Sequence, residues 1–137
     1  MKLFYTMILV SIFNMSIYFS KNRCKFYLKI HLILVCKYRK PLLKDKIDLH
    51  IKKIIKHVEK KSKFSIDIME SDKDHIHLLL DIIPTHSISS IVNRLKSISA
   101  FYIWKLHKDF LKKHFWKEKT FWSDGYFINR RSKSRNY

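Results

Sequence analysis

The sequence predicts an α+β domain of the ferredoxin-like type, in which a split β-α-β unit builds an antiparallel sheet with helices on one face. Stretches with strand periodicity and stretches with helical periodicity follow one another in the order β-α-β-β-α-β. The connection between the second and third strands is short enough for an antiparallel hairpin. The 137-residue chain is 47% hydrophobic and 15% aromatic, which provides enough apolar material for one core.

The first half of the predicted fold begins with the run FYLKIHLILVC, from Phe26 to Cys36. Its nearly continuous apolar character is typical of a central strand, and we expect Pro41 to end it. Residues 42–61 carry apolar side chains at helical spacing, which predicts a helix. Residues 65–69 then alternate as a short strand, with Ile66 and Ile68 on one side.

The second half follows a polar turn at residues 71–74 and begins with a strand over residues 75–83. Ser87 is a suitable N-cap for a second helix, whose apolar face starts at Ile88. The stretch from Thr120 to Ile128 predicts a fourth strand with a bulge or bend at residues 123–125. The predicted domain therefore spans residues 26–128, followed by a divergent tail at 129–137.

The first 25 residues form a hydrophobic extension outside this predicted domain. Residues 3–19 carry no charge, so a signal peptide or a membrane anchor must be considered. Only Lys2 precedes the run, no small-residue cleavage pattern follows it, and Asn14 interrupts it, so it is short and polar for a spanning helix. We expect a cytoplasmic protein without membrane contact. Met15 is an alternative to Met1 as the first residue.

The net charge of +18 predicts a polyanionic partner, and nucleic acid is the commonest one. A lysine-rich, AT-biased genome is the alternative explanation. The candidate phosphate contacts lie after the first strand and on the second helix: Lys37, Arg39, Lys40, Arg94 and Lys96. The alternative for these five is an ordinary solvated surface. Tyr38 is a further candidate DNA contact, with base stacking and burial as its two possible roles. The three tryptophans, Trp104, Trp116 and Trp122, are candidates for stacking on bases, with burial as the favoured alternative.

The motif Asp74-His75-Ile76-His77 is the sharpest chemical feature of the chain. Residues i and i+2 of a strand point to the same side, so His75 and His77 project together while Ile76 enters the opposite face. Two adjacent imidazoles form half of a metal site. The alternative is a pair of strand histidines with ordinary hydrogen-bond partners. We expect His31, on the first strand, to be structural.

Three blocks in this order resemble the insertion sequence 200-like transposases, which are single-tyrosine HUH enzymes. They are HLILVCKYRKPLL, ESDKDHIHLLLDIIP and FWSDGYF, with a family-like helix between the last two, and the resemblance covers about residues 26–128. It implies a dimer that binds single-stranded DNA hairpins at element ends. It also implies that His75 and His77 hold Mg²⁺ or Mn²⁺ at a phosphodiester, and that a tyrosine oxygen attacks the phosphorus to form a phosphotyrosine link.

The sequence departs from the family pattern after Ile128. The family places a tyrosine, and a glutamine one turn later, on a helix after the last strand. Here the tail is polar, Tyr137 comes too early, and no glutamine occurs in the chain. We therefore expect a C-terminally truncated, catalytically impaired copy, with Tyr137 the remaining candidate nucleophile. The alternative is a non-catalytic nucleic-acid-binding domain.

Overall fold

The structure, a computed structural model, describes residues 14–20, 23–83 and 86–130. The strands are β1 (Asn14–Ser20), β2 (Arg23–Val35), β3 (Ser65–Asp72), β4 (His75–Ile82) and β5 (Phe127–Arg130). The helices are η1 (Lys37–Arg39), α2 (Asp45–Lys60), α3 (Ile88–Leu106) and α4 (Lys108–His114). Most of the expected hydrophobic extension, and the last seven residues including Tyr137, lie outside the described part.

The sheet contains the four strands that the sequence predicts and a further strand, β1, which lies in the segment expected to form an extension outside the domain. Strand β2 lies at the centre, with β4 on one side and β5 on the other, and β3 pairs with the outer edge of β4. All of these pairings are antiparallel, and β3 and β4 form the expected hairpin, with Asp72 opposite His75. Strand β1 pairs with the first half of β2, in line with β5. The ferredoxin-like α+β fold is confirmed.

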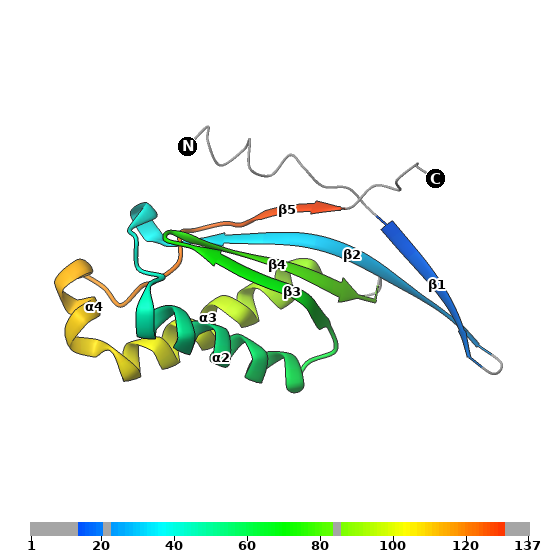
Figure 1. Ribbon diagram of the computed structural model, residues 1–137, viewed down its shortest axis with the longest axis horizontal. Coiled ribbons are helices and arrows are strands. Elements are labelled where there is room, and N and C mark those ends of the chain that lie inside the picture. The colour runs from blue at the N-terminus through cyan, green and yellow to red at the C-terminus, as the bar shows by residue number, and fades with distance from the viewer. Residues whose placement is uncertain (1–13, 21–22, 84–85, 131–137) are drawn as a thin grey trace.

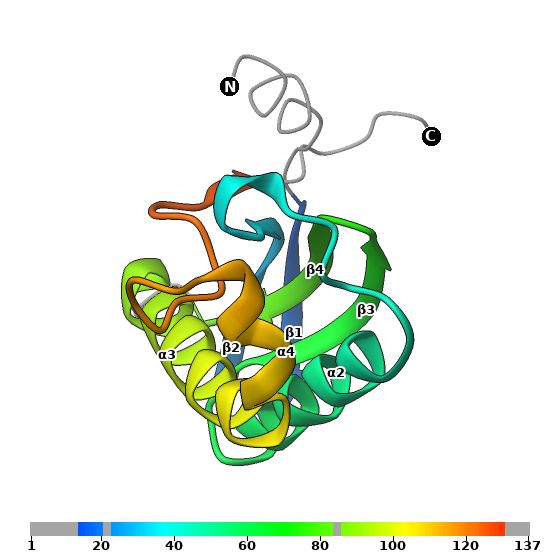
Figure 2. The same cartoon turned by 90° about the vertical axis from the view of Figure 1, so that its left-hand side faces the viewer.

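The helices α2 and α3 cover one face of the sheet, and among the described residues no α-helix covers the other face (Figures 1 and 2). Alternate residues of β2 and β4 enter the covered face, where they pack in the core with apolar side chains of both helices. The buried strand residues on this face are Ile30, Leu32, Leu34, Ile76, Leu78, Leu80 and Ile82, whereas Ile33, Val35 and Leu79 are buried on the opposite face. The sheet face opposite the helices is called the open face below.

Two strands differ from the sequence-based prediction. A register shift between Ile66 and Ile68 interrupts β3, so Ile66 packs against the core while Ile68 is 40% exposed. The expectation that both isoleucines share one side is wrong, because a bulge reverses the alternation after it. The predicted strand 120–128 is also wrong in extent, since only the Cys36–Trp122 bridge precedes β5.

The segment between that bridge and β5 contains the bend that the sequence predicted. Residues 123–126 lie opposite residues 34–35 of β2, so the chain between Trp122 and β5 is longer than the stretch of β2 that it faces. Gly125 has a φ of 76°, a conformation that suits glycine.

Ser87 caps α3 as expected, since its hydroxyl accepts a hydrogen bond from the Ser90 amide at 3.2 Å. Within the described residues, no helix has the length and apolar character to cross a membrane.

Candidate metal and nucleic-acid site

The histidines His75 and His77 lie on the open face, at the end of β4 next to the hairpin turn. Their strand neighbours Ile76 and Leu78 are fully buried on the covered face, whereas the two imidazole side chains are 20% and 27% exposed. The register with β2 places Val35 opposite His75 and Ile33 opposite His77. Both rings lie on the side of the sheet that α2 and α3 leave uncovered, where Ile33 and Val35 are buried with Phe127 packed against them.

A carboxylate orients His75. Its Nδ1 lies 2.9 Å from Oδ1 of Asp74, and Arg39 donates a hydrogen bond to the other carboxylate oxygen at 3.0 Å. Burial alone would raise the pKa of Asp74, but the hydrogen bonds from His75 and Arg39 outweigh it and hold the pKa below its ordinary value. With Nδ1 occupied by the carboxylate, Nε2 is the nitrogen of His75 that remains for a ligand.

A second histidine contacts His77. Nδ1 of His31, on β2, lies 2.6 Å from Nε2 of His77, and the two rings stack almost in parallel with centroids 4.9 Å apart. Glu70 on β3 lies 3.9 Å from Nδ1 of His77. Burial lowers the pKa of His77 more than Glu70 raises it, so the neutral imidazole is favoured. The sequence assigned His31 a structural role, although its strand alternation already placed it on the open face.

The donor atoms of this site suit a divalent cation, but their number is small. His75 and His77 present neutral or carboxylate-oriented imidazoles on one face, which is the donor type that divalent transition metals accept. Across the described residues, however, no group of three histidine, cysteine or acidic side chains is arranged to hold a metal ion. His77 would also have to exchange its contact with His31 for the cation. The site could therefore supply two protein ligands to a cation, and water or substrate oxygen would have to complete the coordination.

The basic turn Lys37–Lys40 lies beside the histidines, at the end of β2. Lys37 is 3.5 Å from Asp124, and Arg39 is held by Asp74. Tyr38 is 71% exposed and adopts a positive φ of 59°. The structure thus brings four of the predicted DNA contacts to the same end of the sheet as His75.

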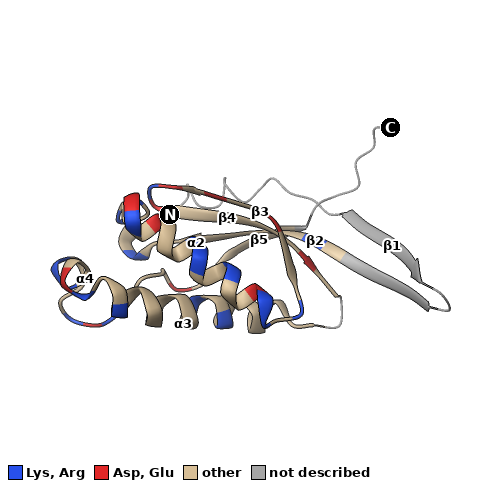
Figure 3. Ribbon diagram, turned by 60° about the horizontal axis from the view of Figure 1, so that its bottom comes forward, with Lys and Arg blue, Asp and Glu red and all other residues tan. Residues whose placement is uncertain are grey.

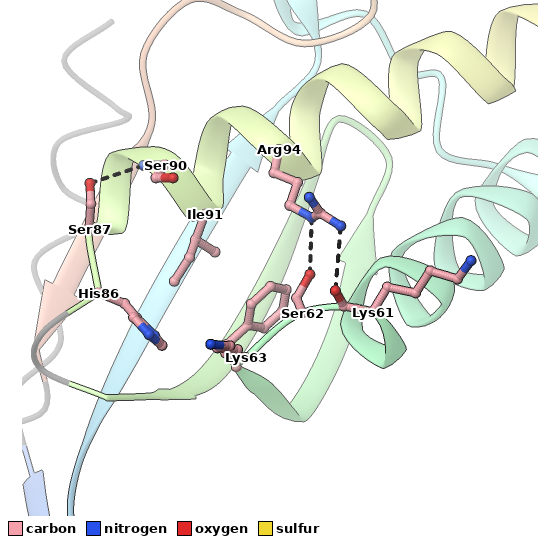
Figure 4. A pocket seen from close by; sticks show the side chains of 9 residues that line it. Lys61, Ser62, Lys63, His86, Ser87, Ser90, Ile91 and Arg94 are labelled. Carbon is pink, nitrogen blue, oxygen red and sulfur yellow. Dashed lines mark hydrogen bonds between the residues drawn. The ribbon is translucent and has the colours of Figure 1, made fainter.

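The other two predicted contacts lie in the helical layer. Arg94 of α3 donates hydrogen bonds to Oγ of Ser62 at 3.1 Å and to the carbonyl oxygen of Lys61 at 3.5 Å, at the rim of a pocket between α2 and α3 (Figure 4). Lys96 donates to the carbonyl oxygens of Ser123 and Gly125. Burial lowers the pKa of Lys96. Lys96 lies close enough to Lys37 and Asp124 for their charges to affect its pKa, so it adjoins the basic turn, whereas Arg94 is held at the end of α2.

Charge is distributed unequally over the molecule. Basic residues follow one another along α2, whereas acidic residues occur on β3 (Figure 3). On the open face, Lys29 is paired with Asp67 and Asp81. Glu70 and Asp74 flank the two histidines. The chain as a whole is strongly basic, but each imidazole has a carboxylate beside it, Asp74 at His75 and Glu70 at His77, although Asp74 is also paired with Arg39.

A family model described as "Transposase IS200 like" matches residues 24–136, well over half of the chain. The chain belongs to the IS200-like transposase family. The match continues beyond Ile128, where we expected the resemblance to end. The histidines, the basic turn and the bend at residues 123–126 all lie inside the matched region.

Relatives and solved structures agree with this assignment. The chain is 28% identical over 101 residues to the transposases of insertion sequence IS200 from Salmonella typhimurium and Salmonella typhi. That alignment covers 74% of this chain and 65% of each relative's length. A protein from Deinococcus radiodurans assigned as a transposase superposes with a TM-score of 0.74 at 27% identity, covering 85% of this chain and 87% of that chain.

A REP-associated tyrosine transposase, solved with a REP hairpin bound, shares the fold. Its TM-score is 0.56 at 15% sequence identity, and the likeness covers 85% of this chain and 65% of that chain. At this level of identity the likeness concerns the fold alone.

Proposed function

We propose that this chain binds single-stranded hairpin DNA and acts in cutting and rejoining it through a phosphotyrosine link. The observation that carries the proposal is the placement of His75 and His77 on the open face, beside the basic turn at residues 37–40. Membership of the IS200-like family supports a transposase, and the hairpin bound to the REP-associated relative supports a DNA hairpin as the ligand.

The side chains of the proposed site have distinct tasks. His75 and His77 hold a divalent cation, Mg²⁺ or Mn²⁺, which supplies Lewis-acid polarisation of a phosphodiester when bound. Asp74 fixes the ring of His75 and leaves its Nε2 free to coordinate. Lys37 and Lys40 bind phosphates that flank the reacting one, because cations at the strand end offset the charge of the DNA backbone.

The cutting step is a transfer of the phosphoryl group to a tyrosine. The tyrosine oxygen loses its proton and forms a bond to phosphorus, the bond from phosphorus to the 3′ oxygen breaks, and that oxygen leaves as a 3′-hydroxyl. The phosphotyrosine conserves the energy of the phosphodiester, so rejoining needs no nucleotide cofactor. Tyr137 is the candidate nucleophile, and in a homodimer it would serve the histidines of the partner subunit.

The test is to trap the covalent adduct. The full chain is incubated with a labelled single-stranded hairpin and Mn²⁺, then analysed on a denaturing gel. Because this copy is expected to be impaired in catalysis, we expect only a weak adduct. Tyr137→Phe should abolish it, because the nucleophilic oxygen is removed, and His75→Ala or His77→Ala should reduce it by about 100-fold or more. The control is His50→Ala, which removes a histidine on α2, in the helical layer.

The same experiment separates the alternatives. Hairpin binding that weakens with salt, without any adduct, would replace this proposal with a non-catalytic nucleic-acid-binding domain. An adduct that survives Tyr137→Phe would transfer the nucleophilic role to another tyrosine. Failure to bind hairpin DNA at low salt would overturn the proposal altogether.

A further inference from the structure

Two aromatic side chains are unusually exposed, and they line the same pocket. Among the large hydrophobic residues that the structure describes, Trp116 and Tyr38 have the highest exposed fractions, 77% and 71%. They come from segments far apart in the sequence, the turn after β2 and the loop after α4. Both line a pocket of about 230 Å³ together with His114, Phe115, Lys117 and Glu118.

The exposure of Trp116 is not a general property of the tryptophans of this chain. Trp104 and Trp122 are only 6% and 5% exposed. Each donates its indole N–H within the protein, to the carbonyl oxygen of Thr120 at 2.8 Å and to Oγ of Ser99 at 2.9 Å. Two tryptophans therefore serve the core, whereas the third presents its ring to solvent at the pocket.

The backbone holds Tyr38 in an unfavourable conformation. Its φ of 59° and ψ of 19° lie in the left-handed region, which non-glycine residues rarely adopt, and Arg39 follows with a φ of 55°. This geometry places the Tyr38 ring 6.5 Å from the buried ring of Phe115, tilted by 33°. Strain of this kind concentrates at ligand-binding positions.

Positive charge surrounds these rings. Nζ of Lys37 lies 5.6 Å from the centre of the Tyr38 ring, and Nζ of Lys40 lies 5.9 Å from that of Phe115. Lys117 also lines the pocket. A ligand that suits this combination has a flat apolar face and a nearby negative charge. An unpaired nucleotide in a single strand has both.

The pocket is connected to the histidines through the basic turn. Arg39 follows Tyr38 directly and donates to Asp74, and Asp74 in turn contacts His75. A strand of DNA whose phosphate lies at the histidines could therefore reach the exposed rings past the basic turn.

We propose that Tyr38 and Trp116 stack on an unpaired base of single-stranded DNA, while Lys40 and Lys117 hold the adjoining phosphate. This inference rests on the proposed function, because it assigns a base-binding pocket next to the proposed cutting site. Stacking tolerates any base sequence, so the pocket would recognise an unpaired base as such.

The test compares two oligonucleotides with the same backbone charge. One is an oligothymidylate of about twelve nucleotides, and the other is an abasic strand of equal length. Their binding to the full chain is measured by fluorescence anisotropy over a series of salt concentrations. We expect the wild-type chain to prefer the oligothymidylate, and Trp116→Ala to weaken that binding about tenfold without changing its salt dependence, because no phosphate contact is lost.

Two further variants sharpen the measurement. Tyr38→Asn removes the ring but retains a residue that tolerates positive φ, and we expect it to lose the same preference. Tyr102→Ala removes a 45% exposed ring of α3 that does not line the pocket, and we expect no effect. Thermal melts verify that each variant is folded.

The outcomes are distinguishable from failure of the proposed function. If the wild-type chain binds DNA but Trp116→Ala retains the preference for the base-bearing strand, the pocket proposal is overturned and the proposed function stands. If Trp116→Ala instead converts a dimer to a monomer and leaves that preference intact, the pocket is a contact between copies of the chain. If the wild-type chain binds neither strand, both proposals fail.

Discussion

The structure contains two histidine pairs with similar contacts and different surroundings. His31 and His77 meet across β2 and β4, with ring nitrogens 2.6 Å apart. His50 of α2 and His107, which follows α3, meet with ring nitrogens 2.8 Å apart. The ring centroids are 4.9 Å and 5.0 Å apart, so distance alone does not distinguish the two pairs.

Their neighbours differ in charge. The pair on the open face has Glu70 close to His77, and the next histidine along the strand is held by Asp74. Near the pair in the helical layer is Lys46, whose charge, after burial and His50, also lowers the pKa of His107. The pair on the open face therefore has a carboxylate nearby that can offset the charge of a cation, whereas the pair in the helical layer has Lys46, which opposes one. The comparison teaches that nearby carboxylates, rather than contact between imidazoles, identify the candidate metal site.

The largest expected effect is on Mn²⁺ binding, when histidines are removed from the open face or from the helical layer. We expect His75→Ala combined with His77→Ala to weaken Mn²⁺ binding by about 100-fold or more, because both proposed protein ligands are lost. His50→Ala combined with His107→Ala should leave the affinity unchanged. Titration calorimetry of the two double variants measures the difference. Equal losses in both would show that the open face has no special affinity for the metal.

The carboxylate next to His75 should have a smaller effect. Asp74→Asn keeps the size of the side chain but removes its charge, and we expect Mn²⁺ binding to weaken by about tenfold, as for other groups that orient a metal ligand. Asp67→Asn is the matched control, since Asp67 is also on the open face but is paired with Lys29. If both variants bind Mn²⁺ like the wild type, Asp74 has no role in orienting a ligand.

The histidine pair in the helical layer, His50 and His107, should affect only the pH dependence of stability, and only slightly. Burial, His50 and Lys46 lower the pKa of His107 in the folded state, so the unfolded chain takes up its proton at a higher pH. The stabilising contribution is therefore present above about pH 6.5 and is lost as the pH falls through the folded pKa. We expect His107→Asn to reduce the fall in Tm between pH 7.5 and 5.5 by about 2 °C.

The exposed His57 of α2 provides the control for this measurement. We expect His57→Asn to leave the slope of Tm against pH as in the wild type. A slope that His107→Asn does not alter, or that it makes steeper, would contradict the assigned sign.

The sequence by itself determined the features that depend on local geometry. Alternation along a strand has a period of two, so the opposite directions of Ile76 and His77 follow from spacing alone. The helical stripe of α2 and the Ser87 cap of α3 are equally local. The order of these elements was enough to predict the ferredoxin-like fold.

Only the tertiary structure decided which distant residues meet. His31 contacts His77 across 46 positions because of the register between β2 and β4, which no local pattern encodes. Lys96 resembles a free surface lysine in the sequence, but the bend at residues 123–125 occupies its amino group. The three tryptophans are alike in composition, and the path of the chain around them buries two and exposes Trp116. Periodicity is set by neighbouring residues, whereas register and burial depend on segments that are remote in sequence.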